Sequence, residues 1–170
     1  MTEFLDEIAD CVPALRRYAF ALTRDAEAGD DLVQDCLERA IRKQRLWRKT
    51  GSLEAWLFRI LLNLHRNNLR NRKRQAHLVP IEELPAEPSA PPAQPGQVAL
   101  NEIAHALERL PEEQRQVLLL VALEGFSYAT AAEILDIPLG TLMSRLGRAR
   151  AALRKLTRQG SLKPRLRTVK

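Results

Sequence analysis

Arginine and asparagine recur at helical spacing near the middle of this 170-residue chain. In AWLFRILLNLHRNNLRNRKR, the side chains of Arg59, Asn63, Arg66 and Arg70 fall at i, i+4, i+7 and i+11, on one stripe of a helix. Guanidinium groups suit phosphates, whereas an amide side chain such as that of Asn67 can also hydrogen-bond to base edges. The stripe therefore predicts nucleic-acid binding, and a helix face that is merely solvated is the alternative.

A basic loop, RKQRLWRKTGS, precedes this helix and carries Trp47. Aromatic rings beside cationic side chains are typical of proteins that bind single strands, because unpaired bases stack on the rings. The loop and the helix together predict contacts to base edges or stacking on unpaired bases.

A second basic helix follows a turn at Asp136, Ile137 and Pro138. In its sequence LGTLMSRLGRARAALRKL, the apolar stripe consists of Leu142, Leu146, Ala149, Leu153 and Leu156. The opposite stripe is small, polar and basic, and consists of Thr141, Ser144, Arg148 and Lys155. Because the preceding SYATAAEIL also has an apolar face, the two helices can close into a helix-turn-helix whose second helix enters a major groove. An ordinary helical hairpin with a solvated basic face is the alternative.

Acidic and basic stretches alternate along the chain. Residues 1–41 hold ten acids and four bases, and residues 42–76 hold eleven bases and the single acid Glu54. Residues 101–143 then hold seven acids and two bases, and residues 144–170 hold ten bases and no acid. The helix DDLVQDCLERAIRK turns Asp31, Gln34 and Asp35 outward, which is unsuited to a polyanion. Each half therefore has one surface for a nucleic acid and another for a different partner.

Residues that could do covalent or metal chemistry do not converge in the sequence. His65, His77 and His105 stand apart from any nucleophile or metal ligand, and no glycine-rich phosphate loop occurs. Cys11 and Cys36 form no close pair, so we interpret both as small buried helix residues. We expect no enzymatic activity, cofactor or metal. No apolar run approaches a membrane span and the N-terminus is acidic, so a cytoplasmic protein without membrane insertion is expected.

The distribution of proline predicts two helical modules. Six prolines lie between Leu78 and Leu100, without a base or an aromatic residue, which predicts a flexible linker. The fold class is therefore all-α, with a module at 1–77, a linker at 78–100, a helix-turn-helix module at 101–158 and a basic tail at 159–170. The second module should include a helix that begins at Pro111 and ends near Gly125. We expect the linker to hold the modules apart until a partner brings them together.

With these motifs in place, the chain resembles the extracytoplasmic-function sigma factors, a family of bacterial transcription initiation factors. DDLVQDCLERA is similar to the polymerase-binding helix of sigma region 2, AWLFRILLNLHRNNLRNRKR to its promoter-melting helix, and SYATAAEILDIPLGTLMSRLGRARAAL to the DNA-reading part of region 4. The phrases LRRYAFALTRDAEAGDDLVQDCLERA and MSRLGRARAALR look closest to the general-stress subgroup. That likeness implies a small helical anti-sigma factor as a partner and a role in stress response.

The resemblance assigns each surface a role in transcription initiation. It implies that the acidic helix docks on the clamp helices of the β′ subunit of core RNA polymerase, through Asp31, Leu32, Gln34, Asp35 and Arg39. It implies that the loop 42–53 and the helix after it capture the nontemplate strand of the promoter minus-ten element. With the residues found above, that set is Trp47, Arg59, Asn63, Arg66, Asn67 and Arg70. It also implies that Thr141, Ser144, Arg145 and Arg148 read minus-thirty-five DNA, and we expect Lys155 to contact phosphate.

Two other functions are compatible with part of these motifs. A LuxR-like helix-turn-helix regulator shares the LPEEQRQVLLL stretch, but it would leave the basic stripe and the acidic helix of the first module without a role. A sigma mimic would titrate an anti-sigma factor without binding DNA. Such mimics carry a receiver domain and have eroded recognition helices, whereas this chain keeps Arg145, Arg148 and Arg150.

Overall fold

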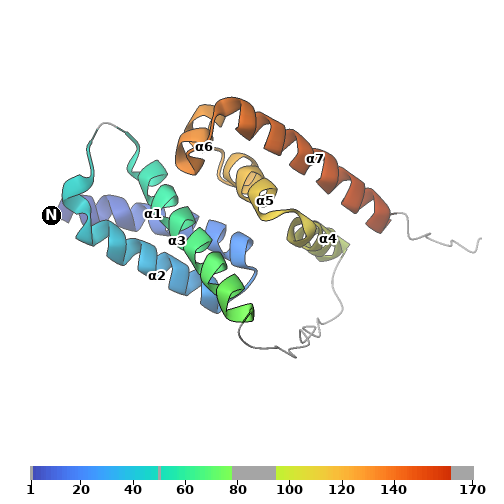
Figure 1. Ribbon diagram of the computed structural model, residues 1–170, viewed down its shortest axis with the longest axis horizontal. Coiled ribbons are helices and arrows are strands. Elements are labelled where there is room, and N and C mark those ends of the chain that lie inside the picture. Colours follow the sequence, from blue (N-terminus) through green and yellow to red (C-terminus); the bar gives the residue numbers. More distant parts are fainter. Residues whose placement is uncertain (1, 50, 78–94, 162–170) are drawn as a thin grey trace, which may run out of the picture.

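The computed structural model describes residues 2–49, 51–77 and 95–161. Over these ranges the chain forms helices and no strands, which confirms the all-α prediction. The elements are α1 (Thr2–Thr23), α2 (Ala26–Arg42), the short η1 (Gln44–Leu46), α3 (Leu53–Ala76), α4 (Pro95–Arg109), α5 (Glu112–Leu118), η2 (Leu119–Leu123), α6 (Tyr128–Leu135) and α7 (Leu139–Ser161). Figure 1 shows them in two groups, with α1–α3 on one side and α4–α7 on the other.

The first group is a three-helix bundle, and side-chain caps begin its helices α2 and α3. The Asp25 carboxylate begins α2 by accepting hydrogen bonds from the backbone N–H groups of Glu27 and Ala28, at 2.9 and 3.2 Å. Ser52 begins α3 in the same way, by accepting from the N–H of Ala55. Gly29 allows α2 to lie against α1, because a Cβ there would stand 3.3 Å from the backbone nitrogen of Phe20.

The second group contains the helix-turn-helix that the sequence predicts. α6 begins at the Ser127 cap, and Asp136 ends it in the left-handed conformation with φ 54°. α7 then packs on α4, α5 and α6. Its inward stripe is the predicted one, with Leu142, Leu146 and Ala149 fully buried or nearly so.

The predicted helix that begins at Pro111 is confirmed with one irregularity. Pro111 stands just before α5, and the helix passes without a break into the π-helical turn η2. Gly125 follows at φ 72°, in the left-handed region that favours glycine, so it ends this helix as expected.

The two groups pack against each other and share one apolar core. α3 contacts α6, and α1 contacts η2. At the centre, the ring of Phe58 lies edge-on to Tyr18 of its own group and to Phe126 of the other, at centroid distances of 5.2 and 5.0 Å. The expectation that the linker holds the modules apart in the free chain is therefore wrong for this structure, because aromatic and polar contacts outweigh the small entropy cost of closing the loop.

The linker boundary also differs from the prediction. Residues 78–94, which make up most of the predicted linker, lie outside the described residues, as do residues 162–170 of the predicted tail. Residues 95–100 form the first turns of α4 instead. Proline is well tolerated in a first helical turn, where its missing N–H has no partner to lose, and so Pro95 begins a helix.

Candidate nucleic-acid and polymerase interface

The acidic face of α2 is exposed to solvent. Asp31, Gln34, Asp35 and Arg39 are all exposed, as the sequence predicts for a docking surface. Leu32 is different, because its side chain is 1% exposed and belongs to the core of the bundle. Its assignment as a polymerase contact is therefore corrected: Leu32 holds the helix in place and cannot touch a partner.

A basic groove runs between α2 and α3. Its volume is about 360 Å³, and its walls come from both helices: Arg39, Lys43, Ile60, Asn63, Arg66, Asn67 and Arg70. Four of the residues predicted for the minus-ten element therefore lie together here. Arg39 lies on the same groove, although the sequence assigned it to the polymerase. Lys43, which the sequence placed in the strand-capturing loop 42–53 without singling it out, also lines this groove, one helical turn after Arg39.

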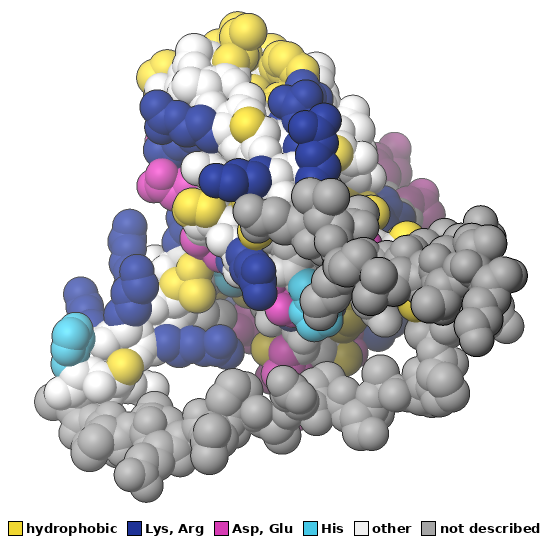
Figure 2. Space-filling model, turned by 90° about the vertical axis from the view of Figure 1, so that its right-hand side faces the viewer, with side chains coloured by type: hydrophobic (Ala, Val, Ile, Leu, Met, Phe, Trp, Pro, Cys, Tyr) yellow, Lys and Arg dark blue, Asp and Glu magenta, His cyan; other side chains and the backbone are white. Residues whose placement is uncertain are grey.

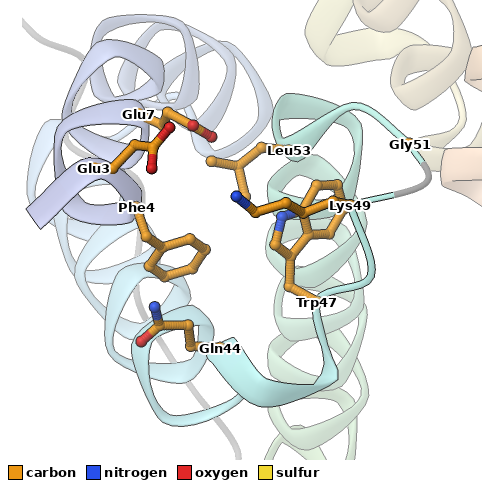
Figure 3. Close-up of a pocket in the computed structure, with 8 residues that line it drawn as sticks. All are labelled: Glu3, Phe4, Glu7, Gln44, Trp47, Lys49, Gly51 and Leu53. Atoms are coloured by element: carbon orange, nitrogen blue, oxygen red, sulfur yellow. The ribbon is translucent and has the colours of Figure 1, made fainter. Parts of the chain in front are cut away.

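Trp47 lies apart from this groove, in a second hollow formed by the loop before α3 and the first turns of α1 (Figure 3). This loop pocket has a volume of about 400 Å³ and is lined by Glu3, Phe4, Glu7, Gln44, Trp47, Lys49, Gly51 and Leu53. The Trp47 ring stands 5.4 Å from the ring of Trp56, centroid to centroid, and is half-buried. Trp47 is therefore part of a pocket wall, and its predicted stacking on unpaired bases would take place inside this pocket.

The outer face of α7 carries the residues predicted to read duplex DNA. Ser144, Arg148 and Lys155 are exposed, and Thr141 is half-buried. Arg145 is partly withdrawn, because its side chain is 24% exposed and lies 3.4 Å from the Glu113 carboxylate. In the view of Figure 2, Lys and Arg side chains gather in the upper part of the molecule and again at lower left.

Two of the predicted DNA-binding arginines on α3 contact the second group of helices. The Arg66 guanidinium donates to the side-chain oxygen of Gln116 on α5, at 3.2 Å. Arg59 lies 3.9 Å from the carboxylate of Asp136, which is the left-handed residue of the helix-turn-helix. We call this packing of the two groups the closed arrangement. In it, part of the basic stripe of α3 contacts the second group of helices and not solvent.

A set of polar contacts, here called the seam, joins the two groups around this point. One of these contacts is a bidentate ion pair, in which Arg17 on α1 donates to both carboxylate oxygens of Glu124, at 3.0 and 2.7 Å. The Glu124 side chain is 1% exposed, whereas that of Arg17 is 52% exposed. The buried Glu124 carboxylate therefore depends on Arg17 to compensate its negative charge.

A second part of the seam centres on the buried His65. Its Nε2 atom lies 2.7 Å from a carboxylate oxygen of Glu112, which also accepts a hydrogen bond from the Gln116 amide at 3.0 Å. Burial would raise the pKa of Glu112, but these hydrogen bonds and the nearby Arg115 outweigh it and lower the pKa. Beside them, the Tyr18 hydroxyl donates to the backbone carbonyl of Gln116 at 3.1 Å, and burial raises the pKa of Tyr18.

The remaining titratable groups show no arrangement for metal or thiol chemistry. Among the described residues, no cluster of His, Cys, Asp and Glu side chains could hold a metal ion. Cys36 is buried as predicted, and burial raises its pKa to about 12, whereas Cys11 is only half-buried. Within the same ranges, no helix is both long enough and apolar enough to cross a membrane.

Comparisons with known proteins match almost the whole chain. Two family models match the chain: the sigma2 domain of PhyR over residues 8–62, and sigma-70 region 4 over residues 100–153. The chain is 40% identical over 155 residues to the ECF RNA polymerase sigma factor EcfG of Rhodopseudomonas palustris, a match that covers 89% of this chain and 83% of that relative.

Solved structures show the same fold. The sigma factor RpoE from Bartonella quintana, in complex with the anti-sigma factor NepR, matches with a TM-score of 0.78 and 34% identity, over 93% of this chain and 98% of that one. The response regulator PhyR from Brucella abortus matches with a TM-score of 0.54 and 24% identity. That match covers 86% of this chain but 42% of PhyR, and it shows a likeness of fold alone.

The chain therefore belongs to the extracytoplasmic-function sigma factors of bacterial RNA polymerase. It is an alternative sigma factor, a protein that directs transcription, and the resemblance found in the sequence is confirmed.

Proposed function

We propose that this sigma factor docks on core RNA polymerase through α2, reads upstream promoter DNA with α7, and captures the nontemplate strand of the minus-ten element with α3 and the loop before it. The observation that carries the proposal is the separation of three surfaces on one chain. An acidic helix face, a basic groove and a basic recognition helix lie on α2, between α2 and α3, and on α7. Each surface suits a different partner or part of the promoter.

The polymerase contact is assigned to Asp31, Gln34 and Asp35. All three side chains are exposed, and none has a salt bridge or hydrogen bond within the described part of the chain. An acidic face of this kind is complementary to a basic helix of a partner, and charged groups of this kind mainly determine partner choice and association rate. Arg39 is assigned to the basic groove instead, because it lines that groove with Asn63 and Arg70.

The minus-ten contact is assigned to the basic groove and to the loop pocket. Exposed Asn63, Asn67 and Arg70 offer amide and guanidinium groups to base edges and phosphates. The loop pocket is large enough for one unpaired base, with Phe4 and Trp47 as apolar walls and Lys49 as a cation. A melted strand that follows the groove would place one of its bases in this pocket.

The minus-thirty-five contact is assigned to Thr141, Ser144 and Arg148, on the first turns of α7. Helix-turn-helix proteins contact base edges with the N-terminal residues of the second helix, and Arg148 is well placed for a bidentate contact to guanine. Lys155 lies about two turns further along the same exposed face and is assigned to phosphate.

Opening of the seam is part of this proposal. Part of the Arg66 guanidinium is occupied while it donates to Gln116, so α3 becomes fully available only after the second group of helices moves away. The α2 face is exposed in the closed arrangement and does not depend on that movement. Polymerase therefore engages α2 of the closed chain first, and strand capture follows the opening.

An anti-sigma factor is the second partner that we propose. The similar RpoE was solved in complex with the anti-sigma factor NepR, and the chain covers almost all of that relative. A partner that binds both groups of helices would keep the seam closed and the Arg66 side chain occupied. Because RNA polymerase supplies the chemistry, no catalytic role is assigned to this chain, and we place its action in the bacterial cytoplasm.

Run-off transcription with purified core polymerase tests the proposed function. A template library with varied upstream DNA should yield transcripts from a defined subset of sequences, and core polymerase alone should yield none of them. The variant Asp35→Lys serves as the control, because it should lose these transcripts and keep its helical circular dichroism. Transcripts that ignore the upstream sequence, or none from any template, would contradict the proposal.

A further inference from the structure

Two large apolar side chains stand exposed on the first two turns of α7. Leu139 is 47% exposed and Met143 is 53% exposed, whereas Leu142 and Leu146 on the same helix are buried. Exposing a side chain of this size to water forgoes the stability that burial would give. Neither residue belongs to the apolar stripe that packs α7 on its neighbours, so packing within the chain does not explain them.

The surroundings of Met143 suit a nucleic acid. Ser144, the next residue of the helix, is exposed, and a Cβ placed on Gly140 or Gly147 would meet no atom within 4 Å. The backbone of this face is therefore bare, and a partner can approach it closely. From residue 144 to residue 158 the chain holds six bases and no acid. A polyanion is thus attracted to the same turns that expose the methionine.

We propose that Met143 contacts the C5-methyl group of a thymine in the upstream promoter element, and so helps to determine which sequence this sigma factor reads. The proposal rests on the assignment of α7 as the recognition helix. In the major groove, thymine is the base that presents a methyl group, and apolar side chains recognise it by contact. Methionine is unbranched and polarisable, so its thioether can reach and fit such a group.

Position along the helix supports this assignment. Met143 immediately precedes Ser144, and both lie near the N-terminus of α7, the end that enters the groove in helix-turn-helix proteins. Gly140 and Gly147 stand at i−3 and i+4 from Met143 and so lie on the same side of α7, which lets this side approach the floor of the groove closely. Met143 is thus a specificity residue that adds to the polar set.

Replacement of thymine by deoxyuridine tests the proposal, because the two bases differ by the methyl group alone. The holoenzyme is assembled from the full chain and core polymerase, and its best-binding upstream duplex is first selected from a random library. Each thymine of that duplex is then replaced in turn. At one position the wild type should lose about fourfold in affinity, the amount expected for one buried methyl group.

Substitution at position 143 then links that methyl group to the methionine. Met143→Ala should bind thymine and deoxyuridine duplexes equally at the same position, whereas Met143→Leu should keep most of the discrimination. Leu123→Ala is the matched control, because Leu123 is a 39% exposed apolar residue outside α7 and should leave discrimination unchanged.

Three outcomes would overturn the proposal. The wild type could ignore deoxyuridine at every position, or Met143→Ala could keep the wild-type discrimination. Met143→Ala could also weaken binding to core polymerase or to another protein while discrimination persists, which would assign Met143 to a protein interface. If Arg148→Ala still relaxes the upstream preference in these cases, the role of α7 stands and the methionine contact alone is wrong.

Discussion

The helices α3 and α7 each bury one stripe and turn a row of cations outward, but their outward faces have different neighbours. On α3, Arg66 donates to Gln116 and Arg59 lies near Asp136, both from the other group of helices. On α7, Ser144 and Arg148 are exposed, and the helix packs on α4, α5 and α6. Figure 1 shows the consequence, with α3 facing the second group and α7 at the outer edge.

The difference indicates an order of events at the promoter. The proposed surface for duplex DNA is accessible in the closed chain, whereas we expect the proposed surface for the melted strand to be completed by opening. The seam contacts decide how much free energy that opening requires. On this proposal, the second module keeps the sigma factor inactive until polymerase and duplex DNA are in place.

The largest effect should come from breaking the seam at its buried carboxylate. Arg17→Ala leaves Glu124 without its partner in a nearly enclosed site, and loss of a buried pair costs about 3–5 kcal/mol. Because Arg17 is half-exposed, we expect about 3 kcal/mol of inter-module stability to be lost, the low end of that range. The inter-module distance, measured by spin labels on Glu27→Cys and Arg154→Cys with Cys11 replaced by serine, should become broad.

Arg16 provides the matched control for that experiment. It is the adjacent arginine, and its ion pair with Asp30 is exposed on both sides and lies within the first group. Arg16→Ala should therefore change stability by about 0.5 kcal/mol or less and leave the distance distribution narrow. Equal broadening in the two variants would show that the Arg17 contact does not hold the modules together.

Core binding should depend on α2 and not on the seam. Asp35→Lys reverses an exposed charge on the proposed polymerase face, and like-charge contacts across an interface cost several kcal/mol. Affinity for core polymerase should fall by at least about a hundredfold in a fluorescence titration. Asp6→Lys, which reverses an exposed acid on α1, is the control and should bind normally. Unchanged affinity of Asp35→Lys would remove α2 from the polymerase interface.

The recognition face of α7 can be divided by two substitutions. Arg148→Ala should lose about 1–3 kcal/mol of discrimination at one upstream base pair, because a bidentate arginine contact is worth that much. Lys155→Ala should weaken binding to all sequences and lower the slope of log affinity against log salt by about one unit. Holoenzyme binding to matched and mismatched duplexes at several salt concentrations separates these effects. Identical behaviour of the two variants would mean that the assignment of Arg148 to bases and Lys155 to phosphate is wrong.

A smaller effect should appear as the seam responds to acid. The pKa of Glu112 is lowered in the closed chain, so its contribution to closure is complete above its ordinary value and is lost as the pH falls through the lowered one. Glu108, whose pKa is lowered by its hydrogen bond with Arg24, acts in the same direction. The spin-label distances should therefore broaden below about pH 4. Glu112→Gln should reduce this pH dependence, and an unchanged profile would exclude Glu112 as its source.

Local patterns in the sequence were sufficient for much of the fold. The turn at Asp136 and the buried stripe of Leu142, Leu146 and Ala149 follow from side-chain types at fixed spacing. The exposed face of α2 and the exposed Ser144 and Arg148 followed from the same helical period. Helical spacing predicts which residues point outward, because that property depends on neighbours within a few turns.

Contacts between distant residues were not accessible in this way. Arg17 and Glu124 are 107 residues apart, and no local pattern marks either as a partner of the other. The half-buried state of Trp47 depends on Trp56 and on the first turns of α1, beyond the reach of the loop sequence. Leu32 shows a different limit, because the family resemblance assigned a role to a residue that the helical period already placed inside.

The distance between the two modules, before and after promoter binding, tests the central claim most directly. The same labels on Glu27→Cys and Arg154→Cys report it, since both positions are exposed and the buried Cys36 does not compete for label. The free chain should give one narrow, short distance, and the complete promoter complex with core polymerase should give a longer one. A broad distribution in the free chain, or an unchanged short distance in a promoter complex that makes transcripts, would contradict a closed sigma factor that opens to capture DNA.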